Sequence, residues 1–174
     1  MRLSFLCLAI ALLLCSCATQ SIKPPVVVAA VDLQRYAGKW HEIAAFPAWF
    51  QRGCTCSTAE YSLRDDGRMR VVNTCRKEGK IKSVEGVARV VAGSNNARLK
   101  VSFQWPFEGD YWVIALDEKD YQWVVVGTPG RDYLWLLSRT PDIAPQLEKK
   151  LIAIAANQGF DVSKLVKTCA TKSR

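Results

Sequence analysis

The single histidine of this 174-residue chain, His41, limits the catalytic chemistry that one copy can perform. A zinc site with two histidine ligands is excluded, and nucleophile–histidine catalysis would depend on His41 alone. Strand alternation in the run 39–46 places His41 on the face opposite Trp40, and no serine or cysteine nucleophile can be assigned beside it. A surface position is the other interpretation of His41. We favour that interpretation and predict no catalytic residue.

Two of the seven cysteines, Cys7 and Cys15, lie in the N-terminal leader, and a third, Cys17, follows it directly. Residues 1–16 carry one positive charge followed by roughly a dozen apolar residues, too few to cross a bilayer as a helix. The sequence Leu14-Cys15-Ser16-Cys17 resembles a lipobox, in which cleavage leaves an N-terminal cysteine that is then acylated. We therefore expect a lipoprotein signal peptide over 1–16 and a palmitate-type lipid anchor on Cys17. An ordinary signal peptide cut nearby is the alternative.

The other four cysteines are Cys54, Cys56, Cys75 and Cys169. Four thiols could in principle bind zinc, but an exported chain meets an oxidising compartment in which disulfides are the usual outcome. Four cysteines allow three pairings, and their spacing alone does not choose among them.

One domain follows the leader. The segment 17–31 contains Pro24-Pro25 and is expected to be a flexible tether, whereas 32–170 has no second linker and no repeat. Short runs of alternating apolar residues, separated by turn signals such as Asp65-Asp66-Gly67, predict an all-β antiparallel meander. The expected strands are 39–46, 57–64, 69–76, 81–92, 97–104, 111–117, 121–127 and 133–138.

The pattern then changes to a helical period. Thr140 is expected to cap a helix that starts at Pro141 and ends near Gly159, with an apolar stripe packed on the outside of the sheet. A meander followed by one helix leaves the two edge strands of the sheet unpaired unless these strands pair with each other and close the sheet. The sequence therefore predicts an eight-stranded up-and-down antiparallel β-barrel with one C-terminal helix on the outside.

Alternation predicts that large aromatic side chains share the inner face of this barrel. A barrel of eight strands is either filled by its side chains or holds one small ligand, and the sequence does not decide between these. The residues expected on common faces are Trp40, Glu42, Ala44 and Phe46, then Val101, Phe103 and Trp105, then Tyr111, Val113 and Ala115, and finally Tyr133, Trp135 and Leu137.

The two ends of the domain carry the strongest motifs. Tyr36-Ala37-Gly38-Lys39-Trp40 and Trp135-Leu136-Leu137-Ser138-Arg139 are similar to the first and last signatures of the lipocalin family, in particular the bacterial outer-membrane lipocalins and apolipoprotein D. The resemblance implies structural roles for Gly38, Trp40 and Arg139, with the arginine stacked on the tryptophan at the closed end. The ligand-binding positions that it implies are Tyr61, Asn73, Phe103, Tyr111 and Trp135, to which periodicity adds Trp105.

The resemblance also implies a function. It suggests a fatty acid or lysophospholipid ligand, held for lipid storage or transport in membrane maintenance under stress, with no cofactor. No nucleic-acid partner is expected, because the sequence has no basic motif interleaved with aromatic residues and the chain is expected to be exported. The resemblance implies Cys56–Cys169 pairing, which leaves Cys54 with Cys75.

Ala18 after the anchor indicates sorting to the outer membrane, with the barrel facing the periplasm, and a homodimer is possible. Trp49 and Phe50 are expected at the open mouth, as ligand contacts or as rim residues. The alternatives are an interaction module with a filled barrel, a lipocalin-fold enzyme and a tetrapyrrole binder.

Overall fold

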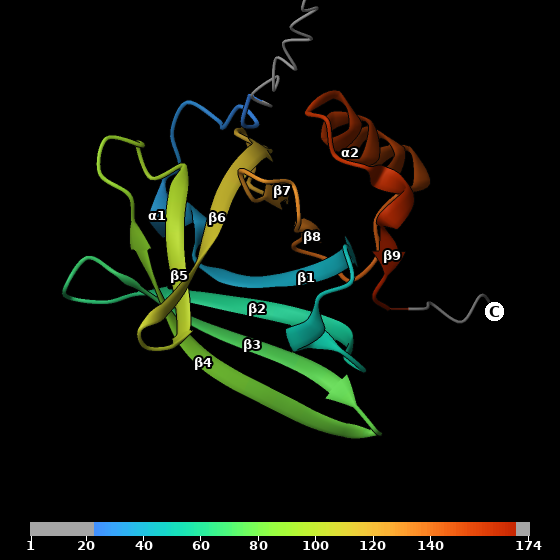
Figure 1. Ribbon diagram of the computed structural model, residues 1–174, viewed down its shortest axis with the longest axis horizontal. Coiled ribbons are helices and arrows are strands. Elements are labelled where there is room, and N and C mark those ends of the chain that lie inside the picture. Colours follow the sequence, from blue (N-terminus) through green and yellow to red (C-terminus); the bar gives the residue numbers. More distant parts are fainter. Residues whose placement is uncertain (1–22, 170–174) are drawn as a thin grey trace, which may run out of the picture.

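Short turns between alternating strands produce a sheet that curls until its first and last long strands meet (Figure 1). The computed structural model describes residues 23–169, so the expected signal peptide and the lipidation of Cys17 lie outside the described residues. All the expected strands are present. They are β1 (Gly38–Ala45), β2 (Thr55–Leu63), β3 (Met69–Lys77), β4 (Lys80–Val90), β5 (Arg98–Gln104), β6 (Phe107–Leu116), β7 (Trp123–Gly127) and β8 (Leu134–Ser138).

Strand β1 closes the barrel because it pairs on both of its edges. His41 is in register with Ser138 of β8, and Gly38 is in register with Tyr61 of β2. A two-residue strand, β9 (Val166–Lys167), pairs with the second half of β1, where the pairing with β2 has ended. The result is the closed eight-stranded antiparallel barrel that the sequence predicts, with one added edge strand.

Strands β1 and β6 each contain a β-bulge, and the side chains after each bulge face the opposite side of the sheet from the one that strict alternation predicts. Trp40 and Glu42 face the interior, but the register of β1 shifts between Glu42 and Ala44, and Ala44 then packs under the outer helix. Strand β6 shifts in the same way between Val113 and Ala115. The expectation that Ala44, Phe46 and Ala115 share the inner face is therefore wrong, because an extra residue reverses the side of every residue after it.

The outer helix, α2 (Pro145–Asn157), packs Leu151 and Ala155 against the barrel wall. It begins four residues later than Pro141. A helix from Pro141 would need the N–H of residue 145 to bond the carbonyl of residue 141, and Pro145 has no N–H, so it fits only the first turn. Gly159, at a φ of +83°, follows the C-terminal end as expected. Neither α2 nor the four-residue α1 (Leu33–Tyr36) is long and apolar enough to cross a membrane, within residues 23–169.

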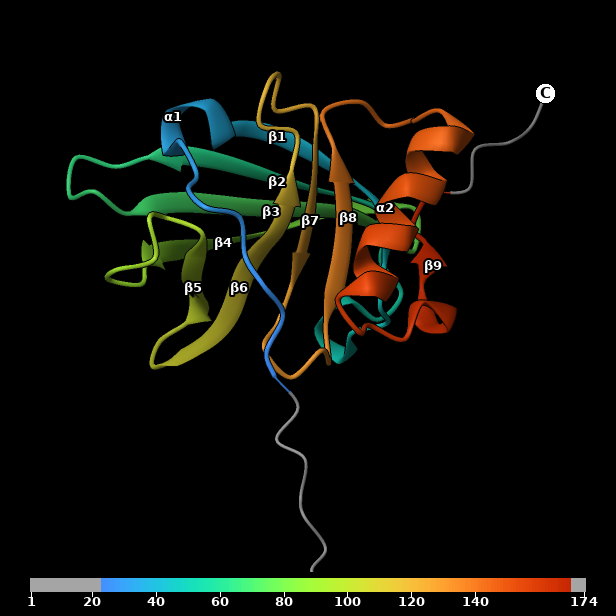
Figure 2. The same cartoon turned by 90° about the horizontal axis from the view of Figure 1, so that it is seen from above.

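Residues 23–31, which we call the strap, lie against the barrel rather than forming a free tether. Val31 is buried and donates its N–H to the carbonyl of Asn95, and Val28 donates to the carbonyl of Val113 on β6. At the other end, Arg131 donates to the carbonyl of Lys23 at 2.8 Å. Figure 2 shows the strap crossing β6 from the α1 end toward the opposite end of the barrel. The prolines keep this segment extended, and its backbone finds partners on the wall.

Candidate functional site

The end of the barrel next to α1 is closed by a stacked arginine. The guanidinium of Arg139 lies 3.7 Å from the ring centroid of Trp40, which is fully buried. Gly38 has a φ of +94°, and a Cβ there would come within 3.3 Å of Arg139 Nη1. Partial burial lowers the pKa of Arg139. Its nitrogens donate to the backbone carbonyls of Tyr121, Lys39, Arg35 and Tyr36 at 2.7 to 3.2 Å.

A continuous series of aromatic rings connects this closed end to the opposite, open end. Each ring centroid lies between 5.1 and 6.5 Å from the next, within the usual range for aromatic pairs. This aromatic series consists of Trp40, Tyr36, Tyr61, Tyr111, Trp135, Tyr133, Phe50 and Trp49, in that order. Three of the predicted ligand-binding residues, Tyr61, Tyr111 and Trp135, are therefore brought together.

Three tyrosine hydroxyls form a small polar cluster inside the barrel. Tyr36 Oη and Tyr111 Oη are 2.5 Å apart, and Tyr61 Oη donates to Tyr111 Oη at 3.1 Å. Burial raises the pKa of Tyr61 to about 12, and burial together with the neighbouring phenols raises the pKa of Tyr111. The three phenols therefore stay neutral and hydrogen-bonded, which satisfies polar atoms that the apolar interior would otherwise penalise.

Asn73 adds a second polar group to the inner wall. It lies two residues beyond the interior Val71 and in register with the partly buried Ala59, so its side chain shares their face. Its Oδ1 is buried and has no hydrogen-bond partner among the described residues. A buried acceptor of this kind costs free energy unless a donor reaches it.

Trp135 is reached from outside through a pocket of about 320 Å³ at the open end, which we call the mouth. Phe50, Tyr133 and Trp135 form its apolar side. The carboxylates in its lining are those of Glu108, Asp110 and Asp132. Its volume falls at the lower end of the range for small-molecule sites. The residues of the closed end do not line it.

Of the predicted ligand positions, Trp135 alone is in the lining of this pocket. Tyr61, Asn73 and Tyr111 belong to the inner wall beyond that lining, and Phe103 and Trp105 lie apart from it. The pairing of β5 with β6 is irregular between Val101 and Gln104, so simple alternation does not hold to the end of the strand. Phe103 covers Gly86, and Trp105 is 82% exposed in the turn that follows. Both line a separate pocket of about 380 Å³ beside the outward-facing Arg89. Trp105 therefore does not line the barrel interior.

Glu42 is a buried acid inside the barrel whose importance sequence analysis did not identify, although alternation placed it on the inner face. Gln51 Nε2 donates to Glu42 Oε2 at 3.0 Å, and Trp135 Nε1 donates to Gln51 Oε1 at 3.4 Å. Burial raises the pKa of Glu42, and the hydrogen bond from Gln51 opposes that shift in part. A carboxyl connected to the Trp135 indole through one amide couples the pocket wall to a titratable group.

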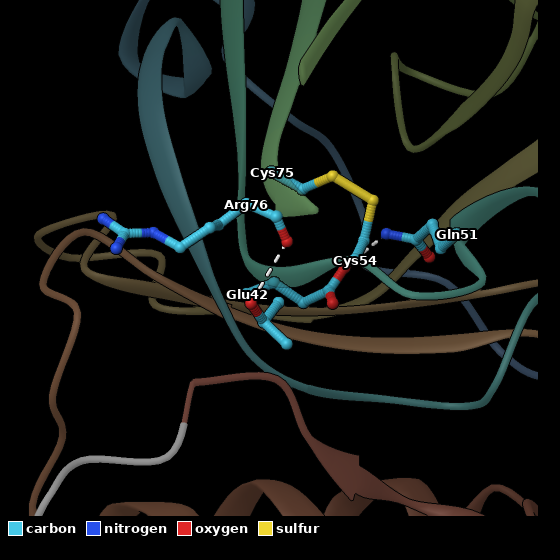
Figure 3. Close-up of a disulfide and its surroundings, with 6 residues drawn as sticks. Glu42, Gln51, Cys54, Cys75 and Arg76 are labelled. Carbon is cyan, nitrogen blue, oxygen red and sulfur yellow. Dashed lines mark hydrogen bonds between the residues drawn. A yellow bond between two sulfur atoms is a disulfide. The ribbon is translucent and has the colours of Figure 1, made fainter. Parts of the chain in front are cut away.

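Two disulfides fix the loops near this group. The short-range disulfide, Cys54–Cys75, joins the loop that carries Gln51 to the end of β3 (Figure 3). The long-range disulfide, Cys56–Cys169, attaches the C-terminal segment to the start of β2 across a separation of 113 residues. These are the pairs that the resemblance implies.

His41 lies half-buried on β1, opposite to the interior Trp40. Burial lowers its pKa, and nearby Lys39 lowers it further. Within residues 23–169 its ring makes no side-chain hydrogen bond to a hydroxyl or a carboxylate. The geometry therefore gives no support for a histidine base.

Comparisons with known proteins agree with this architecture. The lipocalin-like domain family matches residues 31–170. The chain is 46% identical over 154 residues to the outer membrane lipoprotein Blc of Escherichia coli strain K12, covering 86% of each chain. It is 32% identical over 151 residues to apolipoprotein D of Bos taurus, covering 83% of this chain and 79% of that protein. Among solved structures, insecticyanin from the tobacco hornworm superposes with a TM-score of 0.69 at 22% identity, over 87% of this chain and 85% of that one.

Proposed function

This chain belongs to the lipocalin-like family, and on that premise we propose that it binds a fatty acid or lysophospholipid through the mouth pocket. The protein would be anchored to the outer membrane through an acylated Cys17, with its barrel in the periplasm. It would hold or transfer lipids for membrane maintenance under stress. The role is binding rather than catalysis.

The observation that carries the proposal is the pocket that leads from the mouth to Trp135. Burying a methylene contributes about 0.8 kcal/mol, so a sixteen-carbon chain offers roughly 12 kcal/mol against an association cost of about 4–15 kcal/mol. The pocket volume of about 320 Å³ supports insertion of part of such a chain rather than its complete enclosure. Micromolar affinity follows from partial burial.

Native mass spectrometry tests the proposal on the chain from residue 18 onward. We expect a one-to-one adduct with lysophosphatidylethanolamine, weakened about tenfold or more in Trp135→Ala because the truncation removes the wall of the pocket. The matched control is Trp112→Ala, since Trp112 lies on the same barrel but faces outward, and Asp110, which loses the hydrogen bond from its indole, keeps its ion pair with Lys100. A folded protein that forms no adduct with any acyl ligand would instead favour the filled barrel, whose function would lie in protein contacts.

A further inference from the structure

The strap fixes the side of the barrel from which the N-terminal segment leaves. Arg131, which holds the carbonyl of Lys23, belongs to the β7–β8 loop. The neighbouring residues Thr128, Gly130 and Tyr133 of that loop line the mouth pocket. In Figure 2 the described chain accordingly begins beside the β7–β8 turn, at the end opposite α1.

The remaining distance to the proposed anchor is short. Lys23 is the sixth residue after Cys17, and six steps along an extended chain span at most about 20 Å. An acyl chain on Cys17 therefore holds the mouth within about 20 Å of the bilayer surface. The closed end has no such connection, because the strap occupies the full length of the wall between them.

The mouth also exposes large aromatic side chains to solvent. Trp49 is 76% exposed and Phe50 52% exposed on the β1–β2 loop, while Trp105 and Phe107, the latter 72% exposed, flank the β5–β6 turn. We call these four residues the aromatic rim. Tryptophan side chains in particular favour the interface between lipid headgroups and acyl chains.

Basic side chains lie on the same end of the barrel. The exposed Arg52 is in the β1–β2 loop, and Arg76, Lys77, Lys80 and Lys82 surround the β3–β4 turn. Glu78 is the one acid between residues 76 and 82. None of these five cations forms an ion pair within the described part of the chain. Among the acids that line the mouth pocket, Glu108 and Asp110 on β6 are paired with Arg89 and Lys100, whereas the exposed Asp132 on the β7–β8 loop has no ion pair within the described residues.

We propose that the mouth is a membrane-docking surface: its aromatic rim and basic turn seat on a bilayer that contains anionic phospholipid, so that the pocket opens directly onto the lipid headgroups. Exposed aromatic residues and unpaired cations are the two features that favour an anionic interface over water. The anchor is one attachment to the membrane, and the aromatic rim with the basic turn is a second. A stable orientation at the membrane surface requires both. This inference rests on the proposed anchoring at Cys17.

Tryptophan quenching tests the orientation on the full chain, acylated in a Gram-negative host and reconstituted into vesicles of phosphatidylethanolamine and phosphatidylglycerol. Bromine on the acyl chains quenches tryptophans that touch the bilayer. We expect Trp49→Ser/Trp105→Ser to reduce the quenched fraction of the emission at least about twofold, because these are the indoles placed in the interface. The outward-facing Trp112 on β6 is the matched control, and Trp112→Ser should leave the quenched emission unchanged and slightly raise the quenched fraction, because it removes an indole that the bromine does not reach.

Two results would overturn the proposal. Loss of quenching in Trp112→Ser but not in the rim variant would mean that the barrel lies on its strapped side. Absence of quenching in every variant would mean that the mouth faces the periplasm. A second arm replaces Lys80 and Lys82 by Glu, which should reduce quenching in vesicles with phosphatidylglycerol and leave it unchanged in vesicles without that lipid.

The two experiments distinguish failure of the proposed docking surface from failure of the proposed ligand binding. If native mass spectrometry finds no acyl adduct while the rim tryptophans are quenched, the lipid-carrier function is wrong and the docking surface stands. If adducts form while the rim tryptophans are not quenched, the carrier stands and the docking surface is wrong.

Discussion

Replacing Arg139 by alanine should destabilise the protein and leave ligand binding almost unchanged. The substitution removes the cation–π contact with Trp40, at 3.7 Å, which contributes about 1 kcal/mol at a partly exposed site. It also leaves four backbone carbonyls without their donor. Because water can reach part of this group, we assign about 0.5 kcal/mol to each. The expected loss is about 3 kcal/mol, or about 6–12 °C in Tm for a domain of this size.

Thermal unfolding by circular dichroism, with lysophospholipid binding measured on the same samples below Tm, tests this expectation. Arg139→Lys should lose about half as much stability, since an ammonium keeps the charge but cannot reach all four carbonyls. Arg70→Ala is the control, because its exposed ion pair with Glu85 contributes little. Unchanged Tm together with a clear loss of binding would refute the assignment of Arg139 to the closed end and place it in the ligand site.

Three further perturbations address the interior and the cross-links. Glu42 has a folded-state pKa raised above its usual value of about 4.5, so its ionisation should lower stability as the pH rises from about 4.5 through the folded pKa. Glu42→Gln should therefore raise Tm above that window and not below it, whereas a difference independent of pH would contradict the burial argument. Gly86→Ala should lose about 1–3 kcal/mol in urea unfolding, because its Cβ would lie 2.5 Å from the carbonyl oxygen of Ser102, while Gly109→Ala, with its nearest contact at 3.9 Å, should be close to neutral. Removing the long-range disulfide should lower the free energy of unfolding by about 5 kcal/mol and removing the short-range one by about 3 kcal/mol, because they close loops of 113 and 21 residues in the unfolded chain. Equal losses would show that the entropy of the unfolded chain does not control the effect.

The bulges explain where sequence alternation works and where it fails. Alternation places Trp40 and Glu42 correctly on the inner face of β1, and it fails at Ala44 because the register shifts between Glu42 and Ala44. The sequence 38–45 contains no glycine or proline at that position to signal an extra residue. The shift is stabilised by packing of the later residues under α2, a contact between segments about a hundred residues apart, which local patterns do not contain.

In the candidate site, too, some residues are placed correctly by sequence patterns and others are not. Tyr61, Tyr111 and Trp135 occupy interior positions that alternation or family resemblance indicates, because regular ladder pairing extends through them. Trp105 lies beyond the regular part of β5, so periodicity has no basis there. The contact between Glu42 and Gln51 depends on the conformation of a loop that a disulfide fixes, and the sequence indicates the residues but not their meeting.

The strap departs from expectation for a different reason. A proline-containing stretch such as 23–31 is extended whether it is free or docked, so composition cannot distinguish the two. The docked form depends on carbonyl and amide partners, including Asn95 and Val113, supplied by distant strands. A sequence pattern predicts the conformation of such a segment but not its attachment.

The aromatic series gives the protein an internal optical reporter. Tyrosine emission overlaps tryptophan absorption, and the neighbouring ring centroids between Tyr36 and Trp135 are at most 6.5 Å apart. Light absorbed by the buried phenols therefore reaches the indoles at both ends, one sealed under Arg139 and one open at the pocket. A molecule entering the pocket displaces water from Trp135 and changes the part of the emission that this indole contributes. Occupancy can thus be followed in solution without attaching any dye.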